Sequence, residues 1–319
     1  MTSKGTEKMN SSTIGIDLSK DMLDVYRLSD GAARRFTNDK AGYKALIKWI
    51  GGQATRVVFE PTGPYHRAFE QALAKAGLPL VKVNPRQARR FAEATGKLAK
   101  TDRLDAALLA RMGALLELDV RPIHSNILAE LKELRIAREA LIKDRTAAKN
   151  RAKIRTLPLL KQQNAQRLDE IKLQIAAIDA AILTLIKTDA QSAERFRILT
   201  SIPGLSRITA CALLIEMPEL GTLDARQAAS LAGLAPVTRQ SGRWTGRAFI
   251  RGGRASVRRA LYMPALVAAR FNPDLKTNYA KLIAAGKPAK LALTALMRKL
   301  LVLANALIKS QRTWTPKLA

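Results

Sequence analysis

The sequence predicts three parts: an α/β domain, a long helical hairpin, and a mainly α-helical domain. Short apolar strand patterns alternate with helical patterns over the first 120 residues. A heptad repeat of apolar residues follows, and after residue 196 the apolar spacing is helical again. We therefore expect domains over residues 1–120, 121–195 and 196–319, sizes at which domains commonly fold.

Composition excludes several classes of protein. Apolar residues make up 47% of the 319 positions, enough for buried cores. No apolar run approaches the roughly 18 residues of a membrane span, and the N-terminus lacks a secretion signal pattern. These features favour a cytoplasmic protein. Cys211, the single cysteine, lies in an apolar helical context, so we expect a small core residue and no disulfide.

The charge indicates a polyanionic partner. The formal net charge is +29 and the pI is near 10.8, which favours nucleic acid. After Asp224 the chain carries 18 Lys and Arg but one acidic residue, Asp274. Between Arg226 and Arg270 every basic residue is Arg, whose planar fork suits phosphate and base edges. A merely soluble basic surface would intersperse acidic residues among the basic ones.

The first strand is predicted within Thr13–Lys20, a β-branched run in which Asp17 follows the last isoleucine. A hairpin of two further strands, Asp24–Leu28 and Ala33–Thr37, comes next, with Ser29-Asp30-Gly31 as its turn. A helix over Lys40–Ile50 ends at Gly51-Gly52.

The fourth strand is predicted over Arg56–Glu60, which also ends in a carboxylate and is broken at once by Pro61. The remaining elements expected in this domain are a helix over Tyr65–Ala76, a strand over Leu78–Val83, a helix from Pro85, and a helix over Ala106–Leu116. This order matches a RuvC-like, ribonuclease-H-like domain. Right-handed crossovers would place the first and fourth strands side by side.

Four carboxylates are expected to converge in this topology. Asp17 and Glu60 would project from adjacent strand ends, while Asp102 and Asp105 are three positions apart at a helix start. Carboxylate oxygens are ligands that Mg²⁺ prefers, and two such ions can clamp a phosphodiester during displacement. The alternative is structural: Asp17 as a turn cap, and Asp102 and Asp105 as helix caps that offset the dipole.

The middle part is predicted to be a helical hairpin that turns near Thr156–Pro158. Its second helix has a heptad seam of apolar residues: Leu168, Ile171, Ile175, Ile178, Ile182 and Leu185. The seam could pack within the hairpin or against a second copy of the chain. A basic surface on the first helix could follow a nucleic-acid backbone; its residues are Lys143, Arg145, Lys149, Arg151, Lys153 and Arg155.

Pro203-Gly204 separates two helical patterns, the second over Ile208–Glu216. A Pro-Gly turn that opens a helix resembles the helix-hairpin-helix motif, in which backbone amides hold a DNA phosphate. A plain connector between helices would have the same sequence pattern.

An arginine- and glycine-rich stretch, Gly233–Arg259, is predicted to be a nucleic-acid-binding loop. Trp244 and Phe249 are interleaved with its arginines, and an aromatic ring can stack on an unpaired base. The arginines are Arg239, Arg243, Arg247, Arg251, Arg254, Arg258 and Arg259.

Ser241 lies at the centre of this stretch. A serine beside glycine is ordinarily a turn residue, and the chain has two histidines, His66 and His124, in no pattern that suggests a Ser-His-Asp set. Activation of Ser241 would have to come from metal, arginines or a distant carboxylate. His66 could face the carboxylates, although a packing role is favoured.

Taken together, these motifs resemble those of DEDD-type insertion-sequence transposases, relatives of the Piv DNA invertase and described as bridge-RNA-guided serine recombinases. The resemblance covers nearly the whole chain: GIDLSK, VVFEPTGPYH, KTDRLDA, the helical hairpin, SIPG, and the block of GLAP, SGRW and GGR. Their order makes it specific.

The resemblance implies a RuvC-like domain, a coiled coil and a C-terminal serine domain. It implies that Asp17, Glu60, Asp102 and Asp105 bind Mg²⁺ or Mn²⁺, and that Ser241 is a nucleophile forming a phosphoserine link to DNA. The expected partners are two DNA segments, a structured RNA and further copies of the chain, as a dimer or tetramer. Two other functions stay open: a RuvC-like hydrolytic nuclease, and a non-catalytic basic protein that packages nucleic acid.

Overall fold

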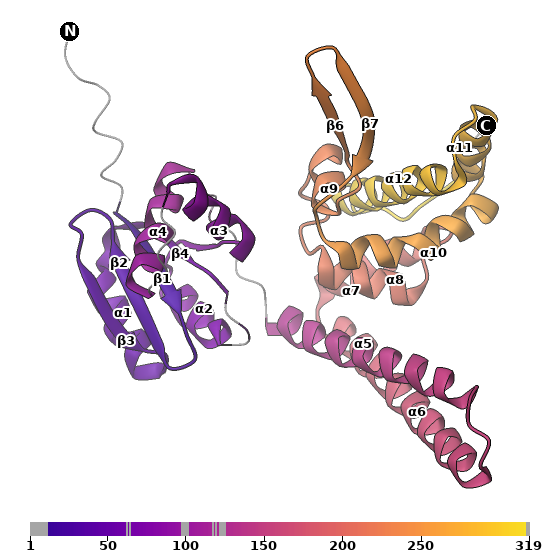
Figure 1. Ribbon diagram of the computed structural model, residues 1–319, viewed down its shortest axis with the longest axis horizontal. Coiled ribbons are helices and arrows are strands. Elements are labelled where there is room, and N and C mark those ends of the chain that lie inside the picture. The colour runs from indigo at the N-terminus through magenta and orange to yellow at the C-terminus, as the bar shows by residue number, and fades with distance from the viewer. Residues whose placement is uncertain are drawn as a thin grey trace. The chain divides into compact units, whose positions relative to one another are not determined.

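The computed structural model describes residues 12–316, apart from positions 62, 64, 97–101, 117, 119 and 121–125. The side chains at 53, 55, 102, 103 and 126 are also outside this description. The chain forms two compact units, Met1–His124 and Ser125–Ala319 (Figure 1).

A five-stranded mixed sheet forms the centre of the N-terminal unit. Its strands are β1 (Ser12–Leu18), β2 (Met22–Arg27), β3 (Ala33–Thr37), β4 (Ala54–Phe59) and β5 (Leu80–Lys82), in the order β3-β2-β1-β4-β5. β1 pairs antiparallel with β2 and parallel with β4. The predicted neighbourhood of the first and fourth strands is therefore confirmed.

Helices cover both faces of this sheet (Figure 1). They are α1 (Lys40–Ile50), α2 (His66–Lys75), α3 (Pro85–Ala94) and α4 (Asp102–Leu115). Ile14 and Ile16 face α1 and α2, whereas Val58 packs with residues of α3 and α4. Burial on both faces explains why the central strands are runs of apolar residues. The arrangement agrees with the predicted α/β domain.

Two glycines let α4 lie directly against the sheet. A Cβ atom on Gly15 would collide with the carbonyl oxygen of Ala106 and the amide nitrogen of Ala110. On α4, a Cβ atom on Gly113 would collide with Val58 and lie 3.2 Å from the Thr13 methyl group. Gly15 of β1 contacts the start of α4, and the earlier residue Thr13 contacts its later residue Gly113. The helix α4 is therefore antiparallel to β1.

The helical hairpin consists of α5 (Asn126–Ala152) and α6 (Pro158–Thr188). Ile171, Ile175 and Ile182 of the predicted seam are buried, and α5 packs along α6. The seam is thus used within the hairpin. At its end Ile186 is buried, not Leu185, which is partly exposed.

The remaining helices build the second core. They are α7 (Ala190–Ser201), α8 (Arg207–Glu216), α9 (Ala225–Leu231), α10 (Ala255–Phe271), α11 (Pro273–Ala284) and α12 (Ala289–Lys309). Leu131 of α5 and Ile182 of α6 belong to the same apolar cluster as these helices. The hairpin and the C-terminal helices therefore share one core.

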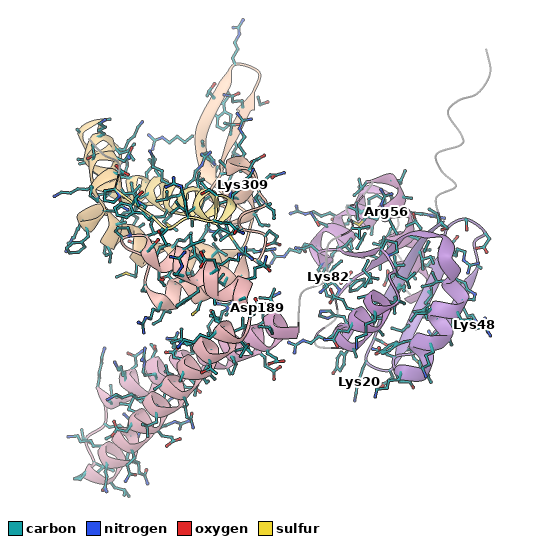
Figure 2. The ribbon with its side chains drawn as sticks, turned by 180° about the vertical axis from the view of Figure 1, so that it is seen from behind. Lys20, Lys48, Arg56, Lys82, Asp189 and Lys309 are labelled. Carbon is teal, nitrogen blue, oxygen red and sulfur yellow. The ribbon has the colours of Figure 1, made fainter. Side chains whose placement is uncertain are left out.

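The arginine-rich stretch is a β-hairpin, and the prediction of a loop there was wrong. β6 (Pro236–Ser241) and β7 (Trp244–Ile250) pair antiparallel, and nearly all of their side chains are exposed. Figure 1 shows the ribbon extending from the body of its unit, and Figure 2 shows its side chains projecting around it. Gly242, at φ +56°, begins the two-residue turn, a conformation that tight hairpin turns require.

In the described part of the chain, α12 alone is long and apolar enough to span a membrane. Its most apolar window is 56% buried. Leu296, Leu300 and Leu301 are fully buried in the second core. Its hydrophobicity is therefore that of a core helix.

The tight contact of α4 with β1 makes a prediction. Gly15→Ala should lower the free energy of unfolding by about 1–3 kcal/mol, because the new methyl group would displace the α4 backbone. Gly52→Ala is the control, since open space surrounds that Cβ position. Urea unfolding of both variants measures the difference; equal stability would show that α4 can move at no cost.

Candidate active site

Asp17 and Glu60 occupy neighbouring positions at the carboxyl ends of β1 and β4. The register pairs Ile16 with Phe59, and each carboxylate residue is the next one along. Gly15 and Val58 also pair and face α4. Because side chains alternate along a strand, Asp17 and Glu60 point to that same α4 face. Both are partly buried.

The first turn of α4 reaches the same end of the sheet. Gly15 contacts Ala106, so the residues before Ala106 lie beside the end of β1 that carries Asp17. Asp105 is partly buried and four positions before Leu109, which packs with Val58. The structure thus brings Asp17, Glu60 and Asp105 to one face and one edge. Asp102 begins α4, and its side chain lies outside the described residues.

The chemistry of this acidic group fits a hard divalent cation. Its donors are all carboxylate oxygens, the ligands that Mg²⁺ and Mn²⁺ prefer. Among the described side chains, no three Asp, Glu, His or Cys stand close enough together to hold a metal ion, and Asp102 is outside that comparison. Carboxylates repel one another unless a cation or a proton neutralises them.

Asn38 joins the loops that follow the two acidic strands, and the sequence reasoning missed it. Its side-chain amide donates to the carbonyl oxygens of Ser19 at 2.8 Å, Lys20 at 3.3 Å and Tyr65 at 3.3 Å. Its Oδ1 accepts a 2.6 Å bond from Tyr43 Oη. Asn38 therefore ties the turn after β1 to the segment after β4.

His66 lies among packing residues on the α2 side. Its Nδ1 donates to the Gly63 carbonyl oxygen at 2.9 Å, and its ring is 6.4 Å from that of Phe59. Its Nε2 is 3.7 Å from Glu70, which also accepts a 2.6 Å bond from Lys82 (labelled in Figure 2). Burial lowers the pKa of His66. Phe59 and Glu60 point to opposite faces, so this cluster is separate from the carboxylates.

Ser241 is the last residue of β6, at the tip of the exposed hairpin. It pairs with Trp244 across the turn, and both residues are exposed. Arg239, Arg243 and Arg247 are exposed along the same hairpin. The tip therefore presents an exposed hydroxyl group on a hairpin that also carries exposed cations.

The arginines after β7 differ in their surroundings. Arg251 and Arg259 are exposed. Arg254 makes two bonds to the Glu219 carboxylate, at 2.7 and 2.6 Å. Arg258 donates to the carbonyl oxygens of Gly252 and, at 3.3 Å, Ala232. These two side chains hold the root of the hairpin in place.

Glycines make the hairpin root very close-packed. A Cβ atom on Gly233 would collide with the Gly252 carbonyl, and one on Gly253 would collide with the Gly233 backbone. All three glycines have positive φ angles, between 60° and 71°. Arg254 also donates its backbone N–H to Leu231 at 2.8 Å. The chain thus enters and leaves the hairpin through a fixed crossing.

The Pro203-Gly204 turn packs on α10. Gly204 has φ +102°, and a Cβ atom there would lie 2.9 Å from the Ala268 methyl group and 3.1 Å from the Pro264 carbonyl oxygen. Ser206 caps α8 by accepting from the Thr209 amide at 3.3 Å. Both features occur in a plain helix connector and in a DNA-backbone motif, so the motif stays a prediction.

Cys211 is buried in the second core, as predicted. Burial raises the pKa of its thiol to about 11. At neutral pH the thiol is therefore protonated and a poor nucleophile.

Comparisons with known proteins agree on one family. Residues 14–162 match a model described as a DEDD transposase of the IS110 type, and residues 196–280 match the transposase model of the IS116/IS110/IS902 family. The pilin gene-inverting protein of Moraxella bovis is 28% identical over 97% of this chain and 99% of its own length.

Two insertion-element proteins are also similar. The IS900 uncharacterized 42 kDa protein of Mycobacterium paratuberculosis is 26% identical over 95% of this chain and 96% of its own. The IS110 uncharacterized 43.6 kDa protein of Streptomyces coelicolor is 32% identical over 48% of this chain and 38% of its own.

These matches identify a DNA transposase, an enzyme that recombines DNA, and the α/β unit agrees with that class. Within that class, the chain belongs to the IS110-type family of DEDD transposases.

The Asn38 contacts make a prediction. Asn38→Ala should lower the free energy of unfolding by about 1–3 kcal/mol, because three carbonyl oxygens lose their donor. Tyr43→Phe removes one bond of the same network and should cost about 1 kcal/mol. At a temperature where Asn38→Ala remains folded, DNA cleavage should fall more than DNA binding. If Asn38→Ala is as stable as the wild type, the Asn38 bonds do not hold the two loops together.

The raised pKa of Cys211 makes a second prediction. The folded state keeps the thiol protonated up to about pH 11, whereas the unfolded thiol ionises near pH 9.0. This contribution to stability is complete below pH 9 and is lost as the pH rises toward 11. Denaturant unfolding at several pH values should therefore show a steeper alkaline loss in the wild type than in Cys211→Ala. Parallel pH curves would contradict the prediction.

Proposed function

We propose that this transposase cuts and rejoins DNA through Ser241, with Mg²⁺ or Mn²⁺ held by Asp17, Glu60, Asp102 and Asp105. The observation that carries the proposal is the shared position of Asp17, Glu60 and Asp105 on the α4 face of the sheet. A divalent cation bound there would supply Lewis acidity to a phosphodiester oxygen. The carboxylates fix where that charge is delivered.

Ser241 is the proposed nucleophile. Its Oγ forms a bond to phosphorus, the bond from phosphorus to one deoxyribose oxygen breaks, and that oxygen takes up the proton that serine gives up. The phosphodiester becomes a phosphoserine diester, so no high-energy cofactor is needed to reseal the strand. Attack by a deoxyribose hydroxyl group of another strand reverses the step and joins the exchanged ends.

Exposed arginines would hold the DNA during this exchange. Arg239, Arg243 and Arg247 lie on the hairpin that carries Ser241, and Arg251 and Arg259 follow it. Guanidinium groups bind phosphate through paired hydrogen bonds. Arg254 and Arg258 have intramolecular partners, so their proposed contribution is to set the direction of the hairpin, with any DNA contact made by their remaining N–H groups.

A structured RNA encoded by the element is the proposed guide. The net charge of +29 would support contacts with more than one polyanion. Exposed basic residues on α5, among them Lys143, Lys149 and Arg151, provide further cations outside the β6–β7 hairpin. We propose that the protein works as a homo-oligomer, a dimer or tetramer, which would bring two DNA segments together.

The Ser241 proposal predicts a covalent intermediate. Wild-type protein incubated with DNA of its element, RNA transcribed from the flanking noncoding region and Mg²⁺ should yield a protein–DNA adduct on a denaturing gel. Ser241→Ala should yield none, because the attacking oxygen is absent. Asp17→Asn should lower adduct yield at least about 100-fold, an effect of the size expected for electrostatic transition-state stabilisation.

Two outcomes would support other functions. Cleavage that survives Ser241→Ala but not Asp17→Asn would indicate a hydrolytic nuclease that uses water. Tight, salt-sensitive binding that Asp17→Asn leaves unchanged, with no strand breakage, would indicate a packaging protein. Ser310→Ala, at the C-terminal end of α12, is a control serine outside the hairpin.

A further inference from the structure

The tip of the β6–β7 hairpin has one face on which four side-chain positions meet. Ser241 pairs with Trp244, and Arg239 pairs with Gly246. Directly paired residues on antiparallel strands share a face, and so do residues two apart on one strand. The proposed nucleophile and the tryptophan are therefore neighbours, with about 5 Å between their Cβ atoms.

Gly246 is a seat for the indole ring of Trp244. A Cβ atom on Gly246 would collide with the six-membered part of that ring. No other residue type could occupy position 246 without moving the ring. Trp244 is nevertheless 59% exposed. One side of the indole thus rests on backbone while much of its surface is open to solvent.

The charge around the indole ring favours a polyanionic ligand. Trp244 is accompanied by three more exposed apolar side chains on the same hairpin, Val237, Phe249 and Ile250, and exposed apolar side chains grouped in this way mark a binding surface. The hairpin carries arginines and no acidic residue between Asp224 and Asp274, so a polyanion fits better than a protein surface. Arg239 is oriented on the same hairpin, with its guanidinium 5.5 Å from the Phe249 ring.

We propose that Trp244, seated on Gly246, is a stacking platform for one unpaired DNA base next to the phosphate that Ser241 attacks. The proposal rests on the assignment of Ser241 as nucleophile, and names the form of DNA which that site takes. Bases in a duplex are already stacked on one another, so the platform selects a nucleotide that has left the helix. Holding its base aside exposes the neighbouring phosphate to Ser241.

Adduct formation tests the platform. A stacked base is worth roughly 1–3 kcal/mol, so Trp244→Ala should slow adduct formation roughly 5- to 150-fold on intact DNA. Trp244→Phe should retain part of the rate, and Gly246→Val should resemble Trp244→Ala. Thr245→Ala is the matched control, because Thr245 pairs with Gln240 on the opposite face of the hairpin.

An abasic nucleotide beside the cleavage site separates stacking from a general defect. On that DNA the wild type and Trp244→Ala should react at equal rates, since no base is left to stack. If Trp244→Ala stays equally impaired on abasic and intact DNA, or if Trp244→Ala and Gly246→Val both react as the wild type does, the platform is refuted. Unchanged thermal melting shows that the variants are folded.

A binding measurement tests the platform even if no adduct forms. In the Ser241→Ala protein, a synthetic DNA duplex with one unpaired 2-aminopurine should bind more tightly than the fully paired duplex, and its fluorescence should be quenched by the indole. Adding Trp244→Ala should abolish both differences. Equal binding of the two duplexes by the Ser241→Ala protein would overturn the platform, whereas quenching without any wild-type adduct would overturn the Ser241 assignment alone.

Discussion

The contact between α4 and β1 is the constraint on which the acidic edge of the sheet depends. Gly15 and Gly113 leave no side chain between helix and sheet, so the helix backbone lies at contact distance. Its antiparallel direction brings its first turn to the end of β1. Asp105 thereby reaches the face shared by Asp17 and Glu60. A bulkier residue at either glycine would separate carboxylates that lie far apart in the sequence.

Much of the N-terminal fold could be predicted because its signals are local. The helix over Lys40–Ile50 was predicted to the residue, since Asp39 caps its start and Gly51, with positive φ, follows its end. The β-branched runs gave the strands of the sheet, and the right-handed crossover rule gave the pairing of β1 with β4. The neighbouring positions of Asp17 and Glu60 followed from that pairing.

The parts that escaped prediction depend on distant partners. Asn38 bonds to carbonyl oxygens of three residues up to 27 positions away, which no local pattern reveals. The sequence pattern predicts that Arg254 binds phosphate, whereas in the structure its guanidinium binds the carboxylate of Glu219. The sequence predicts a loop where the β6–β7 hairpin lies. Because its strands have no buried face, they lack the alternation of apolar and polar residues that marks most strands. Its tight turn at Gly242 was the usable signal.

The close backbone contact of Gly233, Gly252 and Gly253 fixes the direction of the hairpin at its root, whereas the residues proposed to act on DNA lie at its tip. The root is held by backbone packed against backbone, whereas the side chains at the tip are exposed to solvent. Exposed residues at that end can therefore be exchanged without repacking a core beneath them, except for Gly246, where a side chain would displace the Trp244 ring. An engineer who wanted this enzyme to accept a different nucleotide would vary the outer positions and leave the glycine junction untouched.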